Sequence, residues 1–227
     1  FRPFPLILCG SSQACAEGMS GLSNVTGVVG MSDAAETIRL ALTLHPNAKD
    51  VLVIADRMIP GRLTRGQFIR TTESGPFSMS NVPPPQGTNW STNNFLWLVR
   101  SLSSESVVIV AESEQSRMGE MPLSQHLISF LSRDSKVPIY TTQSEAVGAG
   151  AVGGYVVNGR LMGQKAGEML NRILANEPVS NIPPVVLGGE GLFDDAQLKR
   201  WGMEDRSLPK GSRIVNREIS FYEKHKH

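Results

Sequence analysis

Charged side chains follow two apolar runs of the sequence at the point where each run ends. Asp56 and Arg57 come after residues 51–55, and Glu112 comes after residues 107–111. If these runs are parallel strands, their carboxyl ends meet at one edge of a sheet. The two carboxylates could then act as general acid and base, bind a cationic group such as a ligand amine, or cap the helices that follow. These interpretations stay open, and Arg57 suits either a ligand carboxylate or a solvated surface position.

A second pattern with chemical meaning is a glycine motif. Gly148, Gly150 and Gly153 fit the spacing G-x-G-x-x-G. A dinucleotide site needs the last glycine to open a helix whose N-terminus faces the pyrophosphate. Here the strand-like residues 155–157 follow instead, and a helical pattern begins only near Arg160. The motif therefore favours a chain crossing between two lobes, where small residues permit close packing and hinge rotation.

Nucleophilic catalysis and metal binding have little support in the sequence. There is no G-x-S-x-G motif, and none of the histidines follows a predicted strand as a catalytic base would. Cys9 and Cys15 match no zinc or redox spacing, and both free thiols and a disulfide stay open for them. We expect no enzyme activity from this domain, no cofactor and no metal.

The composition further limits the classes of protein to which the chain can belong. The 227 residues suffice for one large domain or two lobes of roughly 100 residues each. Lys and Arg number 22 against 21 Asp and Glu, so the net charge of +1 gives no basic footprint for nucleic acid. No apolar run reaches the roughly 18 residues that span a bilayer. Because the sequence begins with Phe-Arg-Pro rather than Met, we expect it to be a piece of a longer protein.

Apolar runs alternate with amphipathic segments almost to the end, as in α/β proteins with parallel sheets flanked by helices. We predict strands at residues 5–9, 25–29, 51–55, 107–111, 137–140 and 155–157, with a further short one near 77–79. We predict helices over residues 34–42, 95–102, 123–131, 162–173 and 194–201. The strand ends predict a ligand-binding rim of Ser11, Ser12, Asp56, Arg57, Glu112, Thr142 and Gln143.

Several segments resemble a known family. Residues 24–28, 44–49, 51–56 and 150–155 are similar to the ABC-transporter substrate-binding proteins of the tryptophan/tyrosine-importer-like group. The ending, through residues 193–202, 208–212 and 220–222, resembles the periplasmic sensor domains of bacterial membrane histidine kinases. The resemblance covers about nine tenths of the chain. The order of the motifs along the chain is stronger evidence for it than any single motif.

The resemblance implies a two-lobed, type I periplasmic-binding fold in an extracytoplasmic protein tethered to the membrane. Its first lobe would comprise residues 1–27 and 148–227, and its second lobe residues 28–147. The strand–helix units that usually precede residues 5–10 are absent from the sequence, so we expect an incomplete first lobe and a sheet edge open to another chain. The hinge would lie at Val25, Thr26, Gly27, Gly148 and Gly150.

The function implied is that of a histidine-kinase-type sensor domain, in which lobe closure on a small ligand is read by a membrane-anchored signalling or transport partner. Asp56, Arg57 and Glu112 favour a polar or zwitterionic ligand such as an amino acid. The alternative is the soluble substrate-binding component of an ABC importer. A transcription repressor core and a hydrolase on a similar scaffold are further rivals, and the repressor would need a DNA-binding segment.

Overall fold

The computed structural model describes residues 4–11, 18–19, 21–31, 34–54, 78–81, 92–111 and 123–217. The chain divides into two compact units, which are described separately. Unit 1 comprises Phe1–Asp33 and Val156–Glu190, and unit 2 comprises Ala34–Tyr155 and Gly191–His227. Among the described residues, no helix combines the length and the apolar character needed to span a bilayer.

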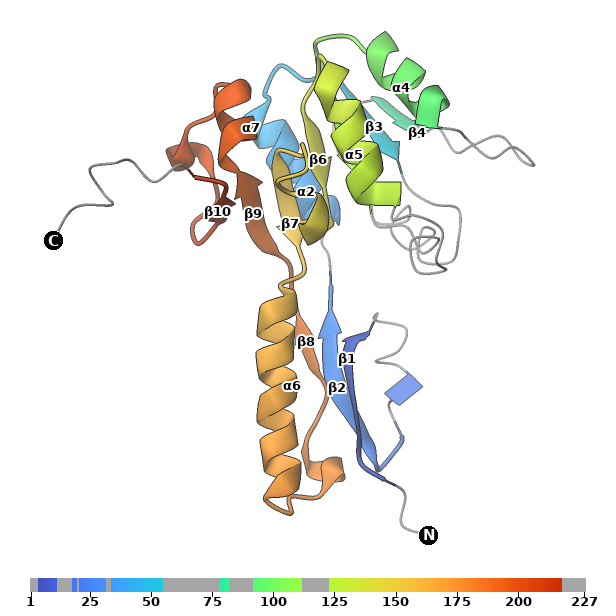
Figure 1. Ribbon diagram of the computed structural model, residues 1–227, viewed down its shortest axis with the longest axis vertical. Helices are drawn as coiled ribbons and strands as arrows, with labels where there is room; N and C mark the ends of the chain where they lie inside the picture. Colours follow the sequence, from blue (N-terminus) through green and yellow to red (C-terminus); the bar gives the residue numbers. More distant parts are fainter. Residues whose placement is uncertain are drawn as a thin grey trace, which may run out of the picture. The chain divides into compact units, whose positions relative to one another are not determined.

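Unit 1 is a small parallel sheet packed on one long helix (Figure 1). Strands β1 (Leu6–Ser11), β2 (Val25–Gly30) and β8 (Val185–Leu187) lie in the order β1-β2-β8, and both pairs are parallel. Helix α6 (Gly159–Leu174) packs on the sheet through Met162 and Met169, which are buried with Val28. A short 3-10 helix, η3 (Val179–Asn181), precedes β8.

Helix α6 begins and ends on side chains suited to those positions. The Asn158 side chain accepts a hydrogen bond from the Leu161 amide at 2.9 Å, which caps the first turn. Asn176 has a φ of 65° after the last turn, and the Glu177 amide donates to the Arg172 carbonyl at 3.1 Å, as in a Schellman motif. Leu170 is 47% exposed, because it lies one position beyond Met169 and so turns away from the sheet.

Unit 2 is built on a four-stranded parallel sheet. Its order is β4 (Ser78–Asn81), β3 (Asp50–Ile54), β5 (Ser106–Val110) and β6 (Ile139–Thr141). A second sheet has the order β10 (Arg213–Val215), β9 (Glu190–Asp194) and β7 (Gly153–Val156). The helices are α2 (Ala34–Leu44), α4 (Thr92–Ser101), α5 (Leu123–Asp134), the 3-10 helix η2 (Ser144–Ala146) and α7 (Asp195–Arg200), followed by η4 (Asp205–Ser207).

Both faces of the four-stranded sheet are buried, which explains its uninterrupted apolar strands. Side chains alternate along β3, so that Val51 and Val53 belong to one core while Leu52 and Ile54 belong to the other. The first core is completed by residues of α2 and α7, including Ile38 and Leu198. The second is completed from α4 and α5 by Leu96, Val99, Leu127, Ile128 and Leu131.

The glycine-rich segment joins the two sheets of unit 2. The Val152 amide donates to the Ile139 carbonyl at 2.7 Å, and the Val152 carbonyl accepts from the Asp194 amide at 2.9 Å. A Cβ atom on Gly154 would lie 2.0 Å from the Thr141 carbonyl oxygen, which leaves no room for any side chain. Because this motif runs into strand β7 rather than into a helix, it serves backbone packing and does not form a dinucleotide-binding turn.

The two units differ from the lobe boundaries expected from the sequence. Residues 191–217 were expected in the first lobe but lie in unit 2. The reason is packing: Phe193 and Leu198 are buried in the same core as Ile38 and Val51. Strands β9 and β10, which hold this segment in place, were not predicted.

Gly154→Ala should destabilise the protein by about 3 kcal/mol or more, because the added methyl group has to displace the backbone of β6. Gly163→Ala is the matched control. Nothing lies within 4 Å of a Cβ at Gly163, so this change in an exposed turn of α6 should add roughly 0.5–1 kcal/mol of stability. Urea unfolding of both variants measures the difference, and equal midpoints would contradict the packing described here.

Candidate functional site

The carboxyl ends of three neighbouring strands meet at one edge of the unit 2 sheet. Ile54 of β3 is paired with Val110 of β5, and Val110 is paired with Thr141 of β6. This confirms the strand arrangement on which the predicted rim depends. Asp56, Arg57 and Glu112 follow β3 and β5 but lie outside the described residues, so their place at this edge stays a prediction.

Thr142 and Gln143 are the predicted rim residues that the structure describes here with their side chains. Thr142 is 4% exposed and its amide donates to the Val110 carbonyl at 3.4 Å, which ties the end of β6 to the end of β5. The Thr141 hydroxyl accepts a hydrogen bond from the Gln143 amide at 3.1 Å. These contacts turn the chain from β6 into η2 and hold both residues at the sheet edge.

The side chain of Gln143 stands out at this edge. Gln143 is only 8% exposed, and it precedes η2 without capping it. Within the part of the chain that the structure describes, its side-chain amide makes no hydrogen bond. A primary amide carries two donors and an acceptor. Those of Gln143 are not fully enclosed, since among the described residues Oε1 of Gln197 is the enclosed side-chain atom that lacks a hydrogen bond. Gln143 can therefore hold a polar ligand group by donating and accepting at once.

The edge of the sheet in unit 1 is described in less detail. Ser11 ends β1, as predicted, but its side chain is outside the described part, and so are Ser12 and Cys15. Cys9 is an exposed free thiol. The ligand-binding role of Ser11 and Ser12 stays a prediction.

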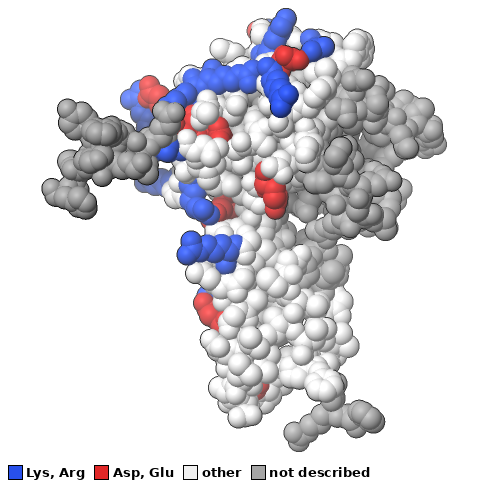
Figure 2. Space-filling model, viewed as in Figure 1, with Lys and Arg blue, Asp and Glu red and all other residues white. Residues whose placement is uncertain are grey.

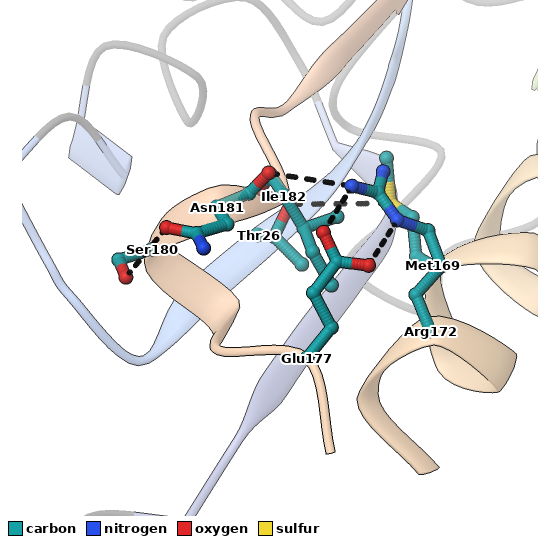
Figure 3. Close-up of polar contacts among 7 residues, drawn as sticks. All are labelled: Thr26, Met169, Arg172, Glu177, Ser180, Asn181 and Ile182. Atoms are coloured by element: carbon teal, nitrogen blue, oxygen red, sulfur yellow. Dashed lines mark hydrogen bonds and ion pairs between the residues drawn. The ribbon is translucent and has the colours of Figure 1, made fainter. Parts of the chain in front are cut away.

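The first group of predicted hinge residues lies within unit 1. Val25, Thr26 and Gly27 form the start of β2, and Thr26 is fully buried. Its hydroxyl donates to the Ile182 carbonyl at 2.7 Å (Figure 3). This contact holds the segment that leads into β8 against β2, so Thr26 contributes to the packing of the unit.

Figure 3 also shows the polar contacts that close the C-terminal end of α6. The Arg172 guanidinium donates to the Glu177 carboxylate at 2.8 Å and to the Asn181 carbonyl at 3.3 Å. The hydrogen bond between the two side chains raises the pKa of Arg172 and lowers the pKa of Glu177. Both groups are already paired, so this cluster is structural.

The second group of predicted hinge residues lies within unit 2. A Cβ atom on Gly148 would lie 3.0 Å from the Asn216 side chain, and one on Gly150 would lie 2.0 Å from the Ser132 hydroxyl. Both glycines therefore pack against neighbouring segments of the same unit. The hinge motion itself stays a prediction.

Two buried carboxylates elsewhere in unit 2 have structural roles, because each is hydrogen-bonded or paired within the unit. Asp194 accepts from the Gln197 amide at 2.8 Å, capping α7, and from the Asn216 side chain at 2.6 Å. Asp195 pairs with Lys199 at 2.6 Å and with Arg217 at 3.4 Å. These hydrogen bonds and charges, chiefly those of Lys199, lower the pKa of Asp195.

Among the described residues, no group of three potential metal ligands comes together.

The charged surface side chains of the described residues show no pattern that suggests a site. On the face drawn in Figure 2, basic side chains gather over unit 2, with acidic ones among them. Several charged residues of unit 2 are paired, including Lys49 with Glu105 at 2.6 Å and Arg100 with Asp134 at 2.7 Å. Exposed pairs of this kind contribute from about 0 to 1 kcal/mol each, as on an ordinary solvated surface.

A histidine and a tyrosine meet in the interior of unit 2. His45 Nε2 lies 2.9 Å from the Tyr140 hydroxyl, and the two rings are T-shaped with centroids 5.8 Å apart. Tyr140 is fully buried in β6, and burial raises its pKa and lowers the pKa of His45. A fully buried phenol cannot reach a bound ligand, so the pair stabilises the fold.

This pair predicts a pH dependence of stability. Because burial lowers the pKa of His45 in the folded state, the unfolded chain binds the proton more readily. The stability present above the ordinary histidine pKa of about 6.5 is therefore lost as the pH falls from there toward the lowered value. Urea unfolding near neutral pH and near pH ~5 should show this loss. His45→Gln should reduce this loss of stability, while His126→Gln should leave it unchanged. Equal losses of stability in both variants would contradict the assignment of the pH dependence to His45.

Comparisons with known proteins agree with this architecture. Residues 88–195, which include β5, β6 and Gln143, match the family model described as ABC transporter substrate binding protein. None of the curated proteins matches the chain.

Solved structures similar to the chain include three bacterial proteins. A ligand-free, open substrate binding protein with adhesive properties from Clostridium difficile has a TM-score of 0.70 at 20% identity, over 94% of this chain and 72% of that one. An ABC domain in complex with L-Trp from Streptococcus pneumonia has a TM-score of 0.67 at 19% identity, over 93% and 72%. A conserved domain protein from Vibrio cholerae has a TM-score of 0.64 at 13% identity, over 91% and 68%.

The fold is therefore the predicted periplasmic-binding-protein-like α/β fold, with parallel sheets flanked by helices. The family model matches residues 88–195, and the similar structures, at 20% identity or less, show the fold of the chain. They lend no support to the more specific resemblance to histidine-kinase sensor domains.

Proposed function

We propose that the chain is a small-molecule-binding protein of the ABC-transporter type, whose ligand is held at the carboxyl edge of the unit 2 sheet. The observation that carries this proposal is Gln143, whose unpaired side-chain amide lies at the end of β6 inside the segment that matches the family model. The same edge includes the ends of β3 and β5, the strands that Asp56, Arg57 and Glu112 follow.

The proposed ligand is amino-acid-like. The carboxylates of Asp56 and Glu112 suit a ligand ammonium group, and the planar guanidinium of Arg57 suits a ligand carboxylate. The amide of Gln143 would donate to one ligand atom and accept from another. The similar Streptococcus domain was solved with L-Trp, which is an amino acid, and this supports the proposed class.

The mechanism we propose is closure of the two units on the ligand. The chain passes between the units at residues 33–34, 155–156 and 190–191. A ligand with a higher affinity for the closed form than for the open form would shift the equilibrium toward the closed form. We propose binding and not catalysis, in an extracytoplasmic location, with the closed form recognised by a membrane partner.

A sensor domain is the second candidate. It is favoured by the resemblance of the C-terminal motifs at residues 193–202 and 208–212. Arg217, the last residue described, pairs with Asp195 at 3.4 Å and with Asp205 at 2.5 Å, which anchors the end of the described chain to unit 2. The full-length gene distinguishes the candidates, because a sensor requires a transmembrane segment and an output domain in the same protein.

A thermal-shift screen against amino acids, small organic acids, purines and sugars tests the proposal. A ligand that binds only the folded state raises the melting temperature with concentration, and about 2.7 kcal/mol of stabilisation is expected at a hundredfold excess over Kd. Amino acids should give the rise. A dose-dependent rise with sugars or purines alone would contradict the ligand class.

Variants test the position of the site. Gln143→Ala should weaken binding about tenfold, because the hydrogen bonds to one ligand group are lost. Asp56→Ala combined with Glu112→Ala should weaken it further without unfolding the protein. Gln164→Ala, the same change on the exposed face of α6, is the control and should bind like the wild type. Wild-type affinity in the Gln143 and double variants would show that the rim is misplaced.

A further inference from the structure

The crossing at residues 190–191 lies in a segment that consists almost entirely of glycine. Gly188 and Gly189 join β8 to Glu190, and Gly191 follows it, so Glu190 is the one residue of these four with a side chain. Glycine has no Cβ atom, which leaves its φ and ψ less restricted than those of other residues. The backbone between β8 and β9 therefore has few restraints of its own, and a contact of the Glu190 side chain has a large effect on it.

The Glu190 carboxylate is hydrogen-bonded to the start of α6. Its Oε2 accepts from the Asn158 side-chain amide at 2.7 Å. The same side chain caps α6, since its Oδ1 accepts from the Leu161 amide at 2.9 Å. With that oxygen used by the cap, the Asn158 side chain offers the donors of its NH₂ group, and a carboxylate offers only acceptors. The two groups are therefore complementary, and hydrogen bonds to a charged acceptor are about twice as strong as neutral ones.

This hydrogen bond lies next to two of the places where the chain passes between the units. Asn158 comes just after the crossing at 155–156, and Glu190 is the last residue before the crossing at 190–191. The strands that contain these crossings, β7 and β9, are hydrogen-bonded neighbours in one sheet. The bond therefore ties the segments at both crossings to the first turn of a 16-residue helix in unit 1.

We propose that the hydrogen bond between Asn158 and Glu190 is a latch that restrains these two crossings and so limits the motion of one unit against the other. This inference rests on the closure of the units proposed above, and it adds a contact that regulates closure. While the bond is formed, the glycine segment is held to the start of α6. When the bond is absent, Gly188 and Gly189 can absorb backbone rotation, so the units sample a wider range of positions.

Pulsed EPR distance measurements, with one spin label on each unit, test the latch without any ligand. Gln164→Cys in α6 and Arg133→Cys in α5 provide exposed labelling positions. The background carries Cys9→Ser and Cys15→Ser, so that only these two positions are labelled.

Two variants remove the latch in different ways. Glu190→Ala deletes the acceptor, while Asn158→Asp keeps a capping oxygen for α6 but sets a second carboxylate against Glu190. Both should broaden the distance distribution relative to the wild type. Glu190→Gln keeps an oxygen that accepts from Asn158 and should preserve the wild-type distribution. Glu168→Ala, on the exposed face of α6, is the matched control and should also preserve it.

The distance distribution separates a latch from a contact that only stabilises unit 1, because such a contact would change the melting temperature and leave the distribution as it is. Far-UV circular dichroism checks that each variant is folded, and either latch variant decides the matter if the other fails to fold. An unchanged distribution in a folded Glu190→Ala or Asn158→Asp protein would overturn the latch. Equal broadening in Glu190→Gln or Glu168→Ala would overturn it as well.

The latch and the proposed function can fail separately. If an amino acid shifts the wild-type distribution while the latch variants leave it unchanged, the latch is wrong and the binding function stands. If the latch variants broaden the distribution of a protein that binds none of the screened ligands, the latch stands and the proposed function is wrong.

Discussion

The close approach of residues 152–154 to β6 and β9 is the contact on which the rest of unit 2 depends. Val152 bonds to Ile139 on one side and to Asp194 on the other, and Gly154 lies directly against the Thr141 carbonyl. A side chain at this position would separate the strands. The contact fixes the end of β6, and with it the place of Thr142 and Gln143. It also seats β9, whose Phe193 completes the core formed by α2 and the four-stranded sheet.

Most of the parallel strands could be predicted from the sequence, because strands buried on both faces consist of continuous apolar residues. Residues 51–55 and 107–111 are the clearest examples, and they correspond to β3 and β5. Strands β9 and β10 could not be predicted this way, because EGLFD and RIV are short and mixed in polarity. They form because partner strands are already in place, which is a tertiary effect and is invisible in a local pattern.

The candidate site could be predicted in part. The rule that ligands lie beyond the carboxyl ends of parallel strands located Thr142 and Gln143, and the register of β3, β5 and β6 confirms that these strand ends are neighbours. The sequence could not show that Gln143 would be only 8% exposed, because that depends on how η2 packs. Nor could G-x-G-x-x-G be interpreted from spacing alone, since its role depends on whether a strand or a helix follows it.

The central claim is that a small ligand binds at the carboxyl edge of the unit 2 sheet. Backbone amide NMR spectra of the assigned protein, recorded with increasing amounts of the ligand that the thermal screen identifies, test it most directly. The account predicts saturable shifts at Thr142 and Gln143, together with the residues that follow β3 and β5. Saturable shifts that leave Thr142 and Gln143 unchanged, for example shifts confined to the polar cluster at the end of α6, would contradict it.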